Sequence, residues 1–108
     1  MTRISFSVTA REDRRAITAY TVERFGIHQA RRLRARFERV LNTLAGPPMI
    51  GRPRHELDPP GGTFRYFVVM RLFVIVYEPT PSGIRVARIL HGMRRLAAEL
   101  DRDAGDDR

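Results

Sequence analysis

Four residues in the second half of the chain carry side chains that could act on a phosphodiester: Arg65, Arg71, Arg88 and His91. A guanidinium group can donate two hydrogen bonds to a phosphate at once, and an imidazole can gain or lose a proton near neutral pH. Such a set of side chains could therefore cut RNA without a metal ion. The competing interpretation is structural, with Arg65 and Arg88 extending from a sheet into water and His91 ending a strand. The chemical hypothesis requires a fold that brings all four side chains together.

The sequence lacks the residue spacing that other kinds of active site require. The three histidines, His28, His55 and His91, form no HxxxH pair, and the chain has no cysteine, so we expect no metal site. No serine stands in a Gly-x-Ser-x-Gly elbow, which argues against a serine hydrolase. The pair Gly61-Gly62 lies in a loop without the strand-to-helix context of a phosphate-binding turn, so we expect no cofactor.

The charge of the chain predicts a partner rather than a reaction. All 20 basic residues are arginine, and the formal net charge is +8. Such a surface attracts polyanions or an acidic protein, and guanidinium groups can bind phosphate or carboxylate through two hydrogen bonds. A codon bias in the source explains the absence of lysine equally well.

Length and composition favour a single domain, residues 1–108, whose last residues, about 101–108, form a flexible tail. The N-terminus lacks the apolar core of a signal peptide. The most apolar run, residues 67–77, contains Arg71 and is far shorter than the roughly 20 residues of a membrane helix. We therefore expect a cytoplasmic protein with no membrane segment, and the lack of cysteine is compatible with a reducing compartment.

Periodicity predicts an N-terminal strand and then two helices. Residues 4–8 alternate like a half-buried strand, and Thr9 with Glu12 has the spacing of a capping box that would start a helix over about 10–25. Its predicted buried face consists of Ala16, Ile17, Tyr20 and Phe25, and Gly26 would end it.

The second helix, over about 29–45, has the clearest apolar repeat in the chain: Ala30, Leu33, Phe37, Val40, Leu41 and Leu44. The short link at 26–28 predicts an antiparallel hairpin of the two helices. Five arginines should cover the remaining surface, either as a solvated face or as a binding surface: Arg31, Arg32, Arg34, Arg36 and Arg39.

The rest of the chain predicts a loop over 46–62, a meander of three strands and a terminal helix. The strands are expected over about 64–69, 72–78 and 84–90, with the middle strand buried on both faces and the last one only partly buried because of Arg85 and Arg88. Gly92 would allow a turn into a short helix that packs through Met93, Leu96, Ala97 and Leu100. The predicted fold class is α+β, with the helical hairpin covering one face of a small, mostly antiparallel sheet.

Three stretches of this sequence resemble the ParE branch of the ParE/RelE toxin superfamily. They read FSVTAREDRRAITAYTVERFG at the front, GRPRHEL in the loop and VIVYEPTPSGIRVARILHGMR near the end. The resemblance covers about residues 4–97. It is most specific over 74–94, where six residues stand in register: Tyr77, Gly83, Arg88, His91, Gly92 and Arg94.

The resemblance implies the toxin of a bacterial type II toxin–antitoxin module, neutralised by a small acidic ParD-like antitoxin encoded beside it. ParE-type members are associated with poisoning DNA gyrase, whereas RelE-type members cut messenger RNA on the ribosome. This chain has no lysine, and it has no tyrosine after Tyr77, although RelE-like nucleases commonly use such groups. We therefore expect a gyrase inhibitor that acts by binding, without catalytic residues. The alternatives are a ribosome-dependent, metal-independent endoribonuclease and an inactive member that only binds.

The residues expected to contact the target or the antitoxin are Arg88, His91, Arg94 and Arg95. Arg94 and Arg95 lie off the apolar stripe of the terminal helix, so their side chains can reach a partner. Arg95 stands where the family often has an acidic residue, which changes the sign of any contact made there. Nucleic acid would be contacted indirectly, through the antitoxin or the target.

Overall fold

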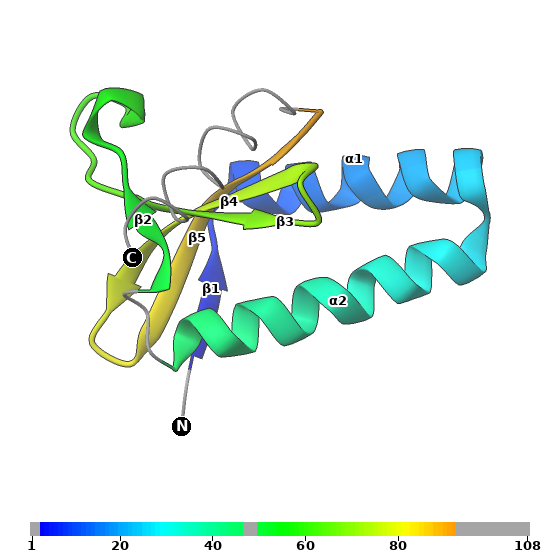
Figure 1. Cartoon of the computed structure of the whole chain (residues 1–108), viewed down its shortest axis with the longest axis horizontal. Helices are drawn as coiled ribbons and strands as arrows, with labels where there is room; N and C mark the ends of the chain where they lie inside the picture. The colour runs from blue at the N-terminus through cyan, green and yellow to red at the C-terminus, as the bar shows by residue number, and fades with distance from the viewer. Residues whose placement is uncertain (1–2, 47–49, 93–108) are drawn as a thin grey trace.

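The N-terminal part of the chain forms one strand and a helical hairpin, and the remainder forms most of a sheet (Figure 1). The computed structural model describes residues 3–46 and 50–92. Its elements are β1 (Arg3–Phe6), α1 (Val8–Phe25), α2 (Ile27–Ala45), β2 (Arg52–Pro53), the 3-10 helix η2 (His55–Leu57), β3 (Arg65–Val69), β4 (Phe73–Thr80) and β5 (Gly83–His91). The C-terminal helix predicted from the sequence lies outside the described residues. No helix in the described part of the chain is long and apolar enough to cross a membrane.

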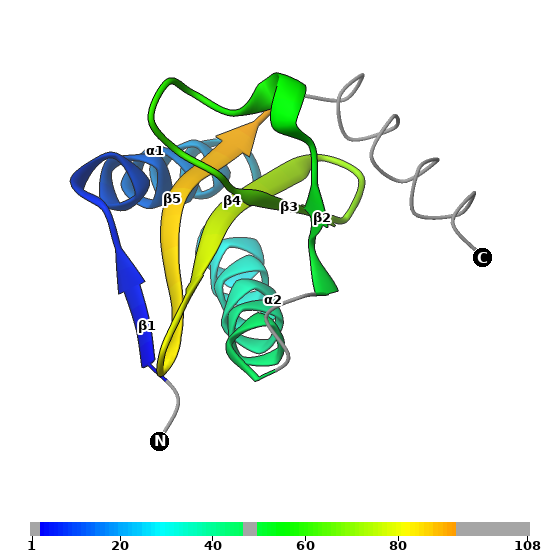
Figure 2. The same ribbon diagram turned by 90° about the vertical axis from the view of Figure 1, so that its left-hand side faces the viewer.

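The sheet has the strand order β1-β5-β4-β3-β2, which Figure 2 shows from one edge to the other. β1 runs parallel to β5, and the other pairs are antiparallel, so the predicted α+β class with a mostly antiparallel sheet is confirmed. The prediction that 46–62 is loop throughout was wrong, since Arg52 and Pro53 pair with β3 and η2 follows. Proline is tolerated in β2 because this strand lies at the edge of the sheet, where one side of the backbone needs no ladder partner.

α1 begins earlier than the sequence predicts, because Ser7 rather than Thr9 caps it. The Ser7 hydroxyl accepts a hydrogen bond from the Ala10 N–H at 2.9 Å and donates one to the Ala87 carbonyl at 2.7 Å. The predicted capping box of Thr9 and Glu12 was therefore wrong, and β1 ends at Phe6 instead of residue 8. One hydroxyl fixes both the helix start and its attachment to β5.

The predicted apolar face of α1 was only partly right. Ile17 is buried, but Ala16 is exposed and Phe25 is 64% exposed. Small or short residues, Ala10 and Thr21, are buried in their place. Phe25 is exposed because the hairpin end extends past the sheet (Figure 1), and there Gly26, with a φ of +89°, ends α1 as predicted.

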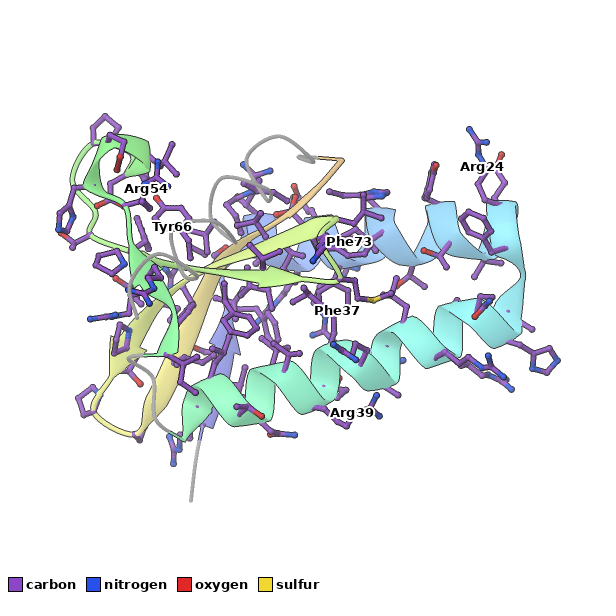
Figure 3. The ribbon with its side chains drawn as sticks, in the orientation of Figure 1. Arg24, Phe37, Arg39, Arg54, Tyr66 and Phe73 are labelled. Carbon is purple, nitrogen blue, oxygen red and sulfur yellow. The ribbon has the colours of Figure 1, made fainter. Side chains whose placement is uncertain are left out.

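α2 and β4 supply most of the core on the helix-covered face. Four of the predicted positions of α2 are buried: Ala30, Phe37, Leu41 and Leu44. Figure 3 shows Phe37 and Phe73 facing each other between α2 and the sheet, and their ring centroids are 5.1 Å apart. β4 is buried on both faces, as predicted, because Leu57 and Phe64 pack against the opposite face.

Candidate functional site

Arg88 is fixed by an acidic residue of α1. The Asp13 carboxylate accepts hydrogen bonds from Arg88 Nε at 2.8 Å and from a terminal guanidinium nitrogen at 3.1 Å. The same carboxylate accepts the backbone N–H of Ile89 at 2.9 Å. β1 ends before this point of β5, so Asp13 takes the place of a neighbouring strand along the edge. The hydrogen bonds to Asp13 raise the pKa of Arg88 above its usual value.

His91 is held between two aromatic rings. Its imidazole stacks on the Phe73 ring, with centroids 4.8 Å apart, and forms a T-shaped contact with the Tyr20 ring, with centroids 5.0 Å apart. The Arg24 guanidinium lies over the Tyr20 ring, 5.3 Å from its centroid. Gly92 has a φ of +80° and forms a bend at the end of β5, as predicted for this glycine. His91 therefore joins α1 to the end of the sheet.

Arg65 contacts a loop. One of its terminal nitrogens donates to the Gly51 carbonyl, and the Tyr77 hydroxyl accepts the Gly51 N–H at 2.8 Å. Tyr77 is fully buried, as expected for a residue of the central strand, and burial raises the pKa of its hydroxyl. Arg65 and Tyr77 thus hold the segment before β2 against the sheet.

Arg71 lies in the turn between β3 and β4. Met70 and Arg71 both have positive φ, +57° and +54°, and the Leu72 N–H donates to the Val69 carbonyl at 3.2 Å. Positive φ angles at both central residues of a β-turn match the twist of an antiparallel hairpin, although Asn and Gly adopt them more readily. Arg71 is exposed there.

The four side chains considered for phosphodiester chemistry are not gathered at one point. Arg65 pairs with Tyr77 and His91 pairs with Phe73, so the two lie beside positions four residues apart on β4. That spacing corresponds to about 13 Å along a strand. Arg88 reaches over the sheet edge to α1. Arg94 and Arg95, the other two predicted contact residues, lie outside the described residues.

A groove with a volume of about 560 Å³ lies between the two helices, and it was not predicted from the sequence. Ile17, Ala30 and Phe37 form much of its apolar lining, and Phe6 and Ile89 reach it from the sheet. Four arginines also border it: Arg11, Arg14 and Arg15 of α1 and Arg34 of α2.

Arg14 differs from the other arginines of the groove because its charge already has a partner. Its guanidinium lies 4.4 Å from the Phe6 ring centroid and contacts the Glu38 carboxylate of α2 at 3.3 Å. Within residues 3–46 and 50–92, the remaining three, Arg11, Arg15 and Arg34, form no ion pair. The spacing of Arg11 and Arg15 places them one turn apart on the same face of α1, which the sequence alone indicates. The sequence does not indicate which residues of α2 face them.

Comparisons with known proteins bear on the fold and on the family of the chain. The fold is similar to a structure described as "Chromosomal ParDE TA system from P. aeruginosa", with a TM-score of 0.65, 21% identity, and coverage of 84% of this chain and 96% of that chain. No curated protein matches the sequence. Residues 4–96 match the family described as "ParE toxin of type II toxin-antitoxin system, parDE". The chain therefore belongs to the ParE family of toxins of type II toxin–antitoxin systems.

Proposed function

We propose that this toxin inhibits DNA gyrase in the cytoplasm by binding to it, and that a small acidic ParD-like antitoxin encoded beside it neutralises the toxin. Membership of the ParE family supports the general assignment. The net charge of +8 supports an acidic antitoxin, since opposite charges steer association.

The observation that favours binding over catalysis is that three of the candidate catalytic side chains already contact other parts of the protein, at separate places. Arg88 is paired with Asp13, Arg65 with a backbone carbonyl, and His91 lies between two aromatic rings. General acid–base chemistry needs such groups within hydrogen-bond reach of one reacting centre. Their separate positions instead support roles in holding the sheet, the loop and α1 together.

A pair of assays with the purified full-length toxin tests this proposal. Increasing toxin should reduce supercoiling by gyrase, while messenger RNA on translating ribosomes should stay intact. Ribosome-dependent cleavage with gyrase unaffected would establish the nuclease alternative instead.

The variant His91→Phe gives a second readout, because phenylalanine keeps the stacking on Phe73 and the contact with Tyr20 but cannot transfer a proton. We expect its inhibition of gyrase to stay within about threefold of the unaltered toxin, whereas loss of a general acid or base typically costs about 10²–10⁴-fold. A loss of that size, with the fold intact by circular dichroism, would contradict the binding mechanism.

A further inference from the structure

The face of α2 that points away from the sheet carries a row of three arginines, Arg32, Arg36 and Arg39, called here the arginine row. Successive residues of a helix are turned by about 100°, so these three lie within about 60° of one another around the axis. All three are exposed, whereas Phe37 on the other side of α2 is buried against the sheet. Figure 3 shows Arg39 directed away from the sheet. The row extends over about 10 Å of the helix.

The charge of α2 is less balanced than that of α1. α2 has five arginines and one acidic residue, Glu38, whereas α1 has four arginines and three acidic residues. Glu38 contacts Arg14 of α1 at 3.3 Å, so its carboxylate is paired away from the arginine row. In the part of the chain that the structure describes, the three arginines of the row form no ion pair. The row is therefore a strip of uncompensated positive charge.

The chemistry of the arginine row favours a phosphate backbone over other anionic surfaces. In α2, which the structure describes in full, Ile27 at the start is the only exposed large apolar residue, whereas the buried centre of a protein–protein interface is usually apolar. A helix that lies on an anionic membrane inserts its apolar face, but the apolar face of α2 is packed on the sheet. Contacts with a nucleic-acid backbone need only a series of positive side chains, because phosphates recur along each strand.

We propose that the arginine row binds the phosphate backbone of duplex DNA directly. Each guanidinium can donate two hydrogen bonds to one phosphate, and such contacts fix position without reading the base sequence. The choice of duplex DNA among nucleic acids rests on the proposed function, because gyrase acts on duplex DNA. This contact is direct, whereas the resemblance of the sequence implied only an indirect one.

The salt dependence of binding counts the phosphate contacts. For duplex DNA, the logarithm of the binding constant falls against the logarithm of the salt concentration with a slope of about −0.9 per neutralised phosphate, so three contacts predict about −2.7. The probe is a short fluorescent duplex of arbitrary sequence, titrated with the full-length toxin and followed by anisotropy. Arg32→Gln/Arg36→Gln should reduce the slope to about −0.9. A second duplex of different sequence should bind with an affinity within about twofold of the first.

The matched control is Arg11→Gln/Arg15→Gln. These residues are also exposed and four positions apart, but they lie on α1, and their replacement changes the net charge equally. The slope should stay unchanged, because Glu12 and the other acidic residues of α1 oppose phosphate binding there. Both variants should unfold like the unaltered toxin, since like charges four residues apart do not stabilise a helix. Equal losses of slope in the two variants would indicate attraction by net charge alone and would overturn the inference.

Two further probes test other occupants of the arginine row. Vesicles containing phosphatidylglycerol should bind no more weakly to Arg32→Gln/Arg36→Gln than to the control variant. If the vesicles depend on these two arginines and the duplex does not, the row is a membrane contact and the inference is overturned. Binding of a messenger RNA fragment through the row, with no binding of the duplex, would overturn it equally.

Supercoiling assays separate this inference from the proposed function. Arg32→Gln/Arg36→Gln should need a higher toxin concentration for half-maximal inhibition of gyrase, and this difference should shrink as salt screens the phosphates. A toxin that binds the duplex through the row and does not inhibit gyrase would support the inference and refute the proposed target. If the toxin inhibits gyrase and the variant keeps the full salt slope, the proposed function stands and the inference is overturned.

Discussion

Asp13 and Arg14 are neighbours on α1, and each pairs with an opposite charge on another element, yet the two pairs differ in kind. The Asp13 side chain is only 15% exposed and accepts three hydrogen bonds, from two nitrogens of Arg88 and from the Ile89 N–H. Arg14 makes one contact of 3.3 Å with Glu38, and both side chains are more open to water. Burial and the number of hydrogen bonds thus distinguish a pair that anchors α1 to the sheet from one that is largely exposed to solvent.

Residues that are neighbours in sequence on a helix, such as Asp13 and Arg14, need not share a role. Successive residues point about 100° apart around the axis, since a turn takes about 3.6 residues. Asp13 consequently faces the edge of β5, whereas Arg14 faces the groove and α2. One helix can therefore anchor the sheet on one side and border the groove on the other.

Removing Asp13 should produce the largest effect. Asp13→Ala leaves the Ile89 N–H and the Arg88 guanidinium without their acceptor, and we expect the free energy of unfolding to fall by about 1–3 kcal/mol. Urea denaturation followed by circular dichroism measures this. The matched control, Glu38→Ala, should change stability by no more than about 0.5 kcal/mol. If both substitutions lowered the free energy of unfolding equally, the two ion pairs would not differ in their contribution to the fold.

A third carboxylate, Asp58, should show an intermediate and pH-dependent effect. Its Oδ1 accepts the Tyr66 hydroxyl at 2.8 Å and the Phe64 N–H at 3.3 Å, and its Oδ2 lies 3.2 Å from His55 Nδ1. Burial acts to raise the pKa of this carboxyl, but the hydrogen bonds from Tyr66, His55 and Phe64 outweigh it and hold the pKa below its usual value.

The direction of that shift fixes the sign of the pH dependence. A carboxyl with a lowered folded-state pKa binds protons more readily in the unfolded state, so its stabilisation is complete above the unfolded pKa of about 3.9 and is lost as the pH falls through the folded value. Asp58→Asn should destabilise the protein at pH 7, and this difference should shrink as the pH is lowered below about 4. Unfolding curves of both proteins across that range provide the test. A difference that grows with acidity would contradict the assignment.

Local patterns in the sequence predicted much of the fold. The three- and four-residue repeat of α2 marked Phe37, Leu41 and Leu44 as core, and the continuous apolar run of β4 marked a strand buried on both faces. Gly26 and Gly92 were correctly predicted to end their elements. These features depend on neighbouring residues, so periodicity and turn chemistry suffice to find them.

The features that escaped prediction depend on residues far apart in the sequence. Ser7 caps α1 while bonding to Ala87, 80 positions away, and the nearby Thr9 offered an equally good capping pattern. Arg88 meets Asp13 across 75 positions, so the sequence could mark its charge but not its partner. The groove likewise exists only once α1, α2 and β5 are packed together.

The most direct test of the division between Asp13 and Arg14 is a pair of double-mutant cycles on the free energy of unfolding, measured by urea denaturation. One cycle combines Asp13→Ala with Arg88→Ala, and the other combines Arg14→Ala with Glu38→Ala. We predict a coupling energy of about 1–3 kcal/mol for Asp13 with Arg88 and of no more than about 0.5 kcal/mol for Arg14 with Glu38. Coupling energies of equal size in the two cycles would contradict the account.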